Sequence, residues 1–165
     1  MNQIQNPYIR DILRRVEAEA MNLIAKHEEK VMYPEQVELM RFPVGTDQPT
    51  HFDTYSDLNN PEPNAPPVVP STEWAAIVYI NKTYTGGNLW FPKQEGIPDG
   101  YTYEPVAREM VMFQGMKFEH GVSKVYKDDR YTIPMWFTTN PKDLRPDLPF
   151  NPHGNRNPEL LNTFK

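Results

Sequence analysis

The sequence predicts a mainly β protein, an all-β barrel or jelly roll with one helix at its N-terminus. Short apolar runs rich in β-forming residues recur between about residues 36 and 140. Clusters of Gly, Pro, Asn and Asp separate these runs, as is typical of folds built from many short strands. Helical periodicity is confined to the first 30 residues, and no β-α-β alternation, Gly-rich phosphate loop or internal repeat follows.

The length and the net charge of the chain limit the number of domains and the kinds of binding partner that we expect. A chain of 165 residues fits one domain with a real core, so we expect a single domain over residues 1–165. Its expected parts are a helix at 7–30, a jelly-roll core at about 36–140 and a proline-rich tail at 141–165. A net charge of -5 argues against nucleic acid or an anionic membrane as a partner, because both require clustered Lys and Arg.

The sequence lacks cysteine, a membrane span and a signal pattern, and these absences limit the expected location and the possible metal ligands. No apolar run is long enough for a membrane span and the N-terminus has no signal pattern, so we expect a cytoplasmic protein. The chain has no cysteine, which excludes disulfides, thiolate metal sites and a cysteine nucleophile. A metal would have to use His, Asp, Glu or backbone ligands, and only four histidines are available: His27, His51, His120 and His153. The sequence carries no signal for an oligomeric state.

The helix is expected to begin at Asn6 and Pro7, because Asn is a good N-cap and Pro suits the first helical position. Apolar residues then recur at three- and four-residue spacing as far as Ile24. Pro34 disfavours helix at the residue before it, so the helix should end near residue 30.

The rest of the chain alternates between strand and turn signals. We expect strands at residues 37–42, 49–55, 73–80, 88–91, 109–113, 120–126 and 130–138. The last two should form a hairpin around Lys127 and Asp128, and residues 93–104 should form a polar loop. Residues 56–71 contain five prolines and cannot be a core element. Their position favours a lid over a disordered segment.

A histidine and an aspartate two residues apart, His51 and Asp53, are the strongest chemical signal. Residues i and i+2 of a strand point the same way, so the imidazole and the carboxylate should share a face. These are two thirds of the facial triad that holds non-haem Fe(II) in oxygenases, and His120 on a later predicted strand is the candidate third ligand. The alternative is a surface histidine beside an aspartate, because His-x-Asp occurs by chance in many proteins.

A cation follows at Arg130. If Lys127 and Asp128 form the turn, Arg130 pairs with Val125 and could bind a carboxylate bidentately near the metal. Lys124 shares strand parity with His120 and is the competing cation, and a solvated hairpin charge is the alternative interpretation of Arg130. Strand alternation places four residues on one face: Arg130, Thr132, Pro134 and Trp136.

These motifs, in this order, resemble the Fe(II)/2-oxoglutarate dioxygenases of the prolyl 4-hydroxylase group. The resemblance covers about residues 36–140 and is carried by His51-x-Asp53, the run 76–81, the run 84–92, His120-Gly-Val and Arg130-Tyr. It implies a double-stranded β-helix (a jelly roll) in which His51, Asp53 and His120 hold the iron. It also implies that Arg130 binds the distal carboxylate of 2-oxoglutarate. Tyr79 matches a tyrosine that bonds the same carboxylate, or is simply a core tyrosine, and Thr132 and Trp136 are weaker cosubstrate-binding candidates.

The resemblance implies an activity as well. The expected reaction consumes O2 and 2-oxoglutarate, releases succinate and CO2, and hydroxylates a prolyl residue of a proline-containing peptide or protein at C4, with ascorbate (vitamin C) as a possible additional cofactor. Asp53 argues against a halogenase, which has a small residue there, and Trp136 stands where nucleic-acid dealkylases have a second arginine. The alternatives are an oxygenase acting on a small molecule such as a free amino acid, and a non-catalytic jelly-roll binding module. One departure is Pro134 inside a predicted strand, which implies a bulge or a sheet edge.

Overall fold

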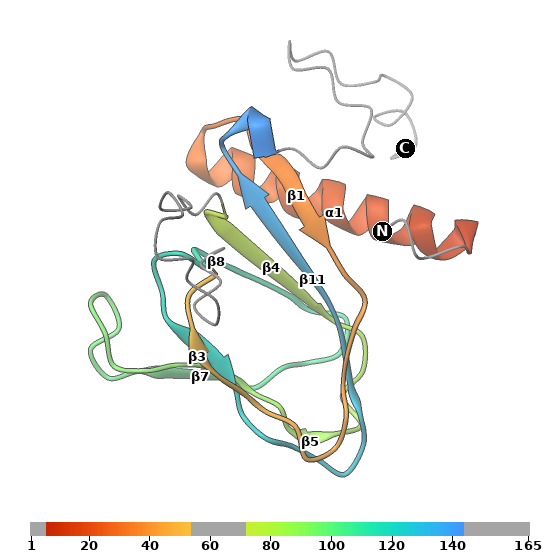
Figure 1. Ribbon diagram of the computed structural model, residues 1–165, viewed down its shortest axis with the longest axis vertical. Coiled ribbons are helices and arrows are strands. Elements are labelled where there is room, and N and C mark those ends of the chain that lie inside the picture. The colour runs from red at the N-terminus through yellow and green to blue at the C-terminus, as the bar shows by residue number, and fades with distance from the viewer. Residues whose placement is uncertain (1–5, 54–71, 144–165) are drawn as a thin grey trace, which may run out of the picture.

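The computed structural model describes residues 6–53 and 72–143, and within them two antiparallel sheets face each other as a jelly roll (Figure 1). The larger sheet has the order β1-β11-β4-β8, with β2 also paired to β11. Its strands are β1 (Tyr33–Val37), β2 (Met40–Phe42), β4 (Trp74–Tyr79), β8 (Met110–Phe113) and β11 (Arg130–Thr138). The predicted mainly β fold is therefore confirmed.

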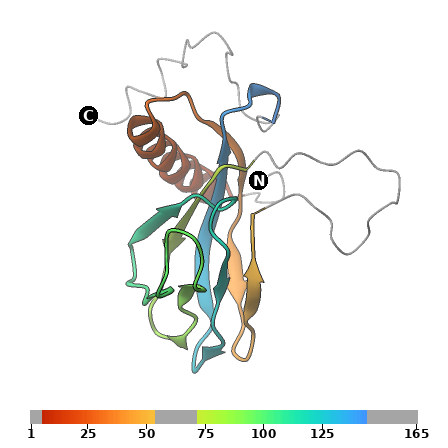
Figure 2. The same ribbon diagram turned by 90° about the vertical axis from the view of Figure 1, so that its left-hand side faces the viewer.

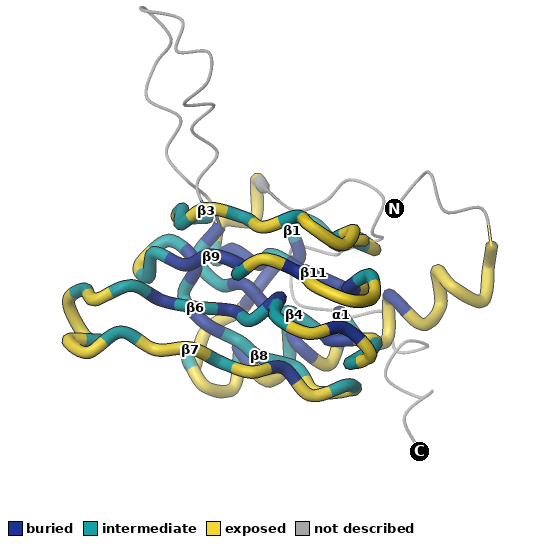
Figure 3. Tube along the Cα trace, turned by 90° about the horizontal axis from the view of Figure 1, so that it is seen from below, coloured by how far each residue is buried: buried dark blue, intermediate teal, exposed yellow. Residues whose placement is uncertain are grey.

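The smaller sheet has the order β3-β9-β6-β7. Its strands are β3 (Gln48–His51), β6 (Leu89–Phe91), β7 (Tyr101–Tyr103) and β9 (His120–Val122). A separate pair joins β5 (Thr85–Gly86) to β10 (Val125–Tyr126), and a short 3-10 helix, η1 (Pro141–Asp143), follows β11. Coloured by burial, β9 and β11 are mostly buried and β7 is mostly exposed (Figure 3).

The N-terminal helix α1 (Pro7–Glu28) has the expected start. The Asn6 side chain accepts hydrogen bonds from the backbone N–H groups of Tyr8 (3.0 Å) and Ile9 (3.4 Å), and Pro7 occupies the first turn. The helix ends slightly before the predicted position, because Glu29 adopts the left-handed conformation with φ 54°.

Helix α1 covers the outer face of the larger sheet (Figure 2). Its buried stripe of Leu13, Ala20 and Ile24 packs against residues of β1, β4 and β11 in one apolar cluster. A second cluster lies between the two sheets and contains Ala75, Leu89, Phe91 and Phe113. The cavity described below lies beside this second cluster.

Strand β11 shows how alternation divides the side chains between these two cores. Ile133, Met135 and Phe137 belong to the cluster under α1. The residues predicted to share the opposite face all line the inner cavity: Arg130, Thr132, Pro134 and Trp136. The alternation proposed from sequence holds along the strand, except that Met135 contributes both to the cluster under α1 and to the cavity wall.

Pro134 does not lie at a sheet edge, because β11 pairs with β4 on one side and with β1 and β2 on the other. Its carbonyl accepts a hydrogen bond from the N–H of Glu38 (3.0 Å), so its missing N–H faces the same neighbour. Glu38 lies in the break between β1 and β2, where the strands form no regular hydrogen-bond ladder. The missing N–H of Pro134 therefore costs the sheet no regular hydrogen bond.

Four predicted strand or loop elements differ from the structure. The strand predicted at 49–55 runs from Gln48 to His51, so Asp53 lies beyond its end. The hairpin of residues 120–126 and 130–138 is wrong: β9 pairs with β3 and β6, β10 pairs with β5, and Arg130 lies opposite Phe42 instead of Val125. The strand predicted at 37–42 begins earlier, at Tyr33, and breaks into β1 and β2. The polar loop predicted at 93–104 contains β7, whose partner is β6.

The expected lid at 56–71 and most of the expected tail lie outside the described residues. Within the described part of the chain, no helix is both long and apolar enough to cross a bilayer.

Candidate metal centre and adjoining cavity

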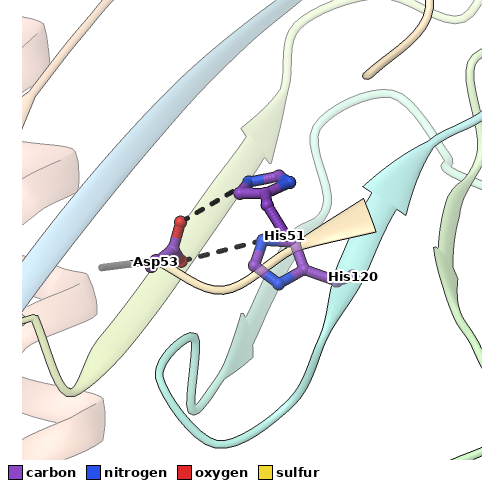
Figure 4. Close-up of side chains that lie close together, drawn as sticks. All are labelled: His51, Asp53 and His120. Carbon is purple, nitrogen blue, oxygen red and sulfur yellow. Dashed lines mark ion pairs between the residues drawn. The ribbon is translucent and has the colours of Figure 1, made fainter. Parts of the chain in front are cut away.

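His51, Asp53 and His120 come together at the end of the smaller sheet. His51 is the last residue of β3, Asp53 follows it in a bend, and His120 opens β9, where it pairs directly with His51. The Nε2 atom of His51 lies 3.8 Å from Asp53 Oδ1, and that of His120 lies 3.7 Å from Asp53 Oδ2 (Figure 4). One ligand atom from each residue falls within 4.8 Å of the other two.

Backbone carbonyls fix the tautomer of both histidines. Nδ1 of His51 lies 3.0 Å from the carbonyl oxygen of Pro49, and Nδ1 of His120 lies 3.0 Å from that of Phe118. A carbonyl oxygen only accepts, so each Nδ1 carries the proton and each Nε2 presents a lone pair on the side of Asp53. Orientation of ligand imidazoles by a hydrogen bond at the other ring nitrogen is usual in metal sites.

The surroundings of His120 favour its neutral form. Its side chain is 5% exposed and packs against the ring of Phe113 at 4.5 Å between centroids. Burial lowers the pKa of His120, and the opposing charge of Asp53 only partly offsets this effect. A neutral imidazole is the form that binds a metal.

The carboxylate of Asp53 fits a cation. Its Oδ2 is buried and has no hydrogen-bond partner among the described residues. The backbone N–H of Asp53 donates to the carbonyl of Gly115 (3.0 Å), and a Cβ built on Gly115 would lie 2.0 Å from Asp53 Oδ2. Gly115 therefore leaves room for the carboxylate, and the donor set of two lone-pair nitrogens and one unpaired carboxylate suits a divalent metal.

A cavity adjoins these three residues and also reaches Arg130 and Thr132 of β11. Arg130 is 1% exposed, and its guanidinium carbon lies 4.9 Å from the ring centre of Phe42 and 5.2 Å from that of Tyr79. Arg130 forms no ion pair within the described residues, so a buried cation faces the cavity without a counter-ion. The rest of the wall is mainly apolar, with Met40, Phe42, Ala75, Leu89, Val122 and Met135 among its residues.

The remaining predicted residues fall in different places. Thr132 is 1% exposed on the cavity wall, and Trp136 lines the same cavity with a half-buried side chain. Tyr79 is not among the residues that line the cavity, but it lies fully buried beside Arg130, which does line it. The Tyr79 hydroxyl is unpaired among the described residues, and burial raises its pKa to about 12. Lys124, the competing cation, is exposed and does not line the cavity.

Two further residues at the site were not predicted from sequence. Gln48 lines the cavity, and its side-chain Nε2 lies 3.3 Å from Nε2 of His51, so a metal there would displace this contact. Gly115 carries no side-chain signal, and only the three-dimensional approach of Asp53 reveals its role. Regular strand alternation places Gln48 and His51 on opposite faces, so the sequence carries no signal for Gln48, and the register irregularity between the two residues is seen only in the structure.

Two imidazoles and one carboxylate at the mouth of a jelly roll, beside a cavity that contains an unpaired arginine, define a class of protein. This class is the mononuclear non-haem iron oxygenases, in which one face of the metal stays open for the cosubstrate and O2.

Comparison with known proteins gives the family. The family model of the 2OG-Fe(II) oxygenase superfamily matches residues 37–138, more than half of the chain. The chain therefore belongs to the 2OG-Fe(II) oxygenase superfamily, whose members use Fe(II), 2-oxoglutarate and O2. The match includes the three clustered residues and Arg130.

Individual relatives are prolyl hydroxylases. The chain is 30% identical to prolyl 3-hydroxylase 1 of Rattus norvegicus over 83 residues, which are 50% of this chain and 11% of that protein. It is 31% identical to prolyl 3-hydroxylase 2 of Gallus gallus over 98 residues, which are 56% of this chain and 14% of that protein. The chain thus spans only a small part of the length of these relatives.

Solved structures share the fold. A 2OG-Fe(II) oxygenase family oxidoreductase from Burkholderia pseudomallei superposes with a TM-score of 0.63 at 14% identity, covering 83% of this chain and 59% of that one. A prolyl-4-hydroxylase from Pseudomonas putida gives 0.58 at 18% identity, covering 82% of this chain and 69% of that one.

Proposed function

We propose that this protein is an Fe(II)- and 2-oxoglutarate-dependent hydroxylase that acts on a prolyl residue in a peptide or protein. The observation that carries this proposal is one cavity bordered by the cluster of His51, Asp53 and His120 and by the unpaired guanidinium of Arg130. The first group suits a metal and the second suits the far carboxylate of a diacid, so one cavity accommodates both.

Each residue has a distinct task in this proposal. His51 and His120 would present their Nε2 lone pairs, and Asp53 its carboxylate, to Fe(II). Arg130 and Tyr79 would hold the distal carboxylate of 2-oxoglutarate, and Thr132 and Trp136 would border it. Fe(II) supplies the oxidising chemistry by which O2 and 2-oxoglutarate yield a hydroxylated substrate, succinate and CO2.

The cavity wall contributes by excluding water. The apolar residues and the ring of Trp136 surround the site where 2-oxoglutarate would bind. In such surroundings the ion pair between Arg130 and a carboxylate is stronger than in water, and the cosubstrate is fixed in one orientation.

The prolyl substrate is supported by the relatives. Both prolyl 3-hydroxylases and a prolyl-4-hydroxylase are among the similar proteins, so a proline-containing peptide is the substrate class we propose. These names disagree about the ring carbon that is hydroxylated, and the assay must distinguish C3 from C4.

The first test is an anaerobic titration with Fe(II) followed by 2-oxoglutarate. The weak visible charge-transfer band of a keto acid chelated to iron should appear in the wild type and be lost in Asp53→Ala. A folded wild-type protein that gives no band would overturn the oxygenase proposal and favour a non-catalytic binding module.

The second test concerns the substrate. Proline-containing peptides should gain one oxygen atom, detected by mass spectrometry, only when 2-oxoglutarate and O2 are both present, with and without ascorbate. Amino-acid analysis of the product separates 3-hydroxyproline from 4-hydroxyproline. Oxygen incorporation into free amino acids but not into peptides would support the small-molecule alternative.

A further inference from the structure

Six buried side-chain polar atoms in the described part of the chain lack a hydrogen-bond partner, and three of the six belong to residues that lie beside one another. These three are Nε of Arg130, the hydroxyl of Tyr79 and the hydroxyl of Tyr84. The three residues are 1%, 0% and 2% exposed, respectively. Unpaired buried polar atoms are rare and unfavourable in native proteins, so three in one place indicate that a ligand completes them.

Tyr84 lies beside Arg130 although it comes from the connection between β4 and β5. A Cβ built on Gly87 would lie 3.0 Å from Cδ of Arg130 and 3.1 Å from Cε2 of Tyr84, so both side chains pack on the same glycine. Gly87 has φ +61°, which an L side chain rarely adopts, and the glycine thereby allows this close approach. Burial raises the pKa of Tyr84, and the positive charge of Arg130 opposes that rise.

The three groups match the chemistry of a carboxylate. A carboxylate offers about four lone-pair sites, and an arginine fork fills two of them at most, so two hydroxyl donors can occupy the rest. Arg130 has no Asp or Glu partner among the described residues, so the ligand must also supply the negative charge.

We propose that Tyr84 is a third anchor of the cosubstrate, its hydroxyl donating to the distal carboxylate of 2-oxoglutarate that Arg130 and Tyr79 also hold. This inference rests on the proposed function and adds a binding residue that the motif resemblance left without a role. Tyr84 lies in the turn that leads into β5, so a hydrogen bond from its hydroxyl would connect this turn to the bound cosubstrate.

The test is the affinity of Tyr84→Phe for 2-oxoglutarate, measured by calorimetry on the full chain loaded with Mn(II) in place of iron. Loss of one hydrogen bond to a charged group should raise the dissociation constant on the order of tenfold, with the affinity for Mn(II) itself unchanged. The matched control is Tyr103→Phe, because the Tyr103 hydroxyl already donates to Glu109 and is not among the unpaired buried groups. Its affinity for 2-oxoglutarate should equal that of the wild type.

A second readout separates binding from a structural role. The Tyr84 hydroxyl is unpaired, so Tyr84→Phe should not lower the unfolding temperature of the metal-free protein. A lowered unfolding temperature, or an unchanged affinity for 2-oxoglutarate, overturns the role of Tyr84. If the Mn(II)-loaded wild type itself binds no 2-oxoglutarate, the proposed function fails, whereas wild-type binding with an unaffected Tyr84→Phe refutes this inference alone.

Discussion

The position of the Asp53 carboxylate depends on Gly115, a neighbouring residue that has no side chain. A Cβ added to Gly115 would lie 2.0 Å from Asp53 Oδ2, far closer than any van der Waals contact, so even a methyl group must displace the carboxylate. If Asp53 binds the metal as proposed, displacing its carboxylate should be costly, because metal coordination tolerates little error in the position of a ligand atom.

We therefore expect Gly115→Ala to weaken metal binding on the order of ten- to a hundredfold, the range seen when groups that orient ligands are changed. The measurement is a Mn(II) titration followed by electron paramagnetic resonance, with Gln114→Ala as the neighbouring control. In the background of Asp53→Ala the clash with the carboxylate is gone and only the contact with the Cβ of residue 53, at 2.9 Å, remains, so the Gly115 substitution should cost the metal-free protein less stability than it does in the wild type. Equal Mn(II) affinity of Gly115→Ala and wild type would contradict this steric account.

At this scale the sequence predicted the residues that can be recognised by type and spacing. His51, Asp53 and His120 do meet, although Asp53 lies just beyond the strand instead of within it. Arg130 reaches the cavity as expected, but from a different strand pairing. Gly115 could not be predicted, because its contribution is an absence of atoms that only the folded chain places next to Asp53.

At the scale of elements, sequence identified where strands lie better than which strands they join. The turn around Lys127 exists, with φ 73° at that residue, but the strands on either side of it enter different sheets. A jelly roll pairs strands that are distant in sequence, and local turn signals carry no information about such partners. Helix α1 was easier to predict from sequence, because its N-cap and its apolar periodicity are both local features.

The packing of α1 on the larger sheet gives an element-scale prediction. Leu13 is 1% exposed in the core beneath the helix, so Leu13→Ala should lower the free energy of unfolding by about 2–5 kcal/mol through lost burial and a cavity. Chemical denaturation measures this effect, and exposed Ile12→Ala is the control on the same helix, expected to change stability by much less. Similar losses for both variants would mean that α1 does not pack on the sheet through this face.

Asp129 connects β2 to the start of β11 and gives a pH-dependent prediction. Its carboxylate accepts hydrogen bonds from Nε of Arg41 (2.7 Å) and from the backbone N–H of Val44 (3.1 Å). The Arg41 hydrogen bond, followed by that of Val44, lowers the pKa of Asp129. Because the folded pKa lies below the unfolded value of about 3.9, the stabilisation is present above that pH and is lost as the pH falls through the folded pKa.

Asp129→Asn should therefore be less stable than the wild type at pH 7, and the difference should shrink below about pH 4. The effect is modest, because the pair lies at the surface and Arg41 is 60% exposed. Thermal unfolding at several pH values measures it, with Asp128→Asn as the adjacent control. A stability difference between Asp129→Asn and wild type that is the same at pH 3 and pH 7 would show that the ionised carboxylate is not the cause.

At the scale of the whole molecule, the proposed metal and the proposed cosubstrate, 2-oxoglutarate, would join different parts of the jelly roll. His51 and His120 both belong to the smaller sheet, so a metal bound by them would tie β3 to β9. Arg130 and Tyr79 belong to the larger sheet, so 2-oxoglutarate chelated to that metal would tie one sheet to the other.

This arrangement predicts two separable steps of stabilisation. Mn(II) alone should raise the unfolding temperature, and 2-oxoglutarate should raise it further only when the metal is present. At a ligand concentration of about 100 times its dissociation constant, each step contributes about 2.7 kcal/mol, or several degrees for a chain of this size. Arg130→Met should keep the Mn(II) step and lose the 2-oxoglutarate step, Asp53→Ala should lose both, and Lys124→Ala should keep both because that lysine is exposed and outside the cavity. If Lys124→Ala lost the second step while Arg130→Met kept it, the cation that holds the cosubstrate would be Lys124, and the cavity beside Arg130 would need another ligand.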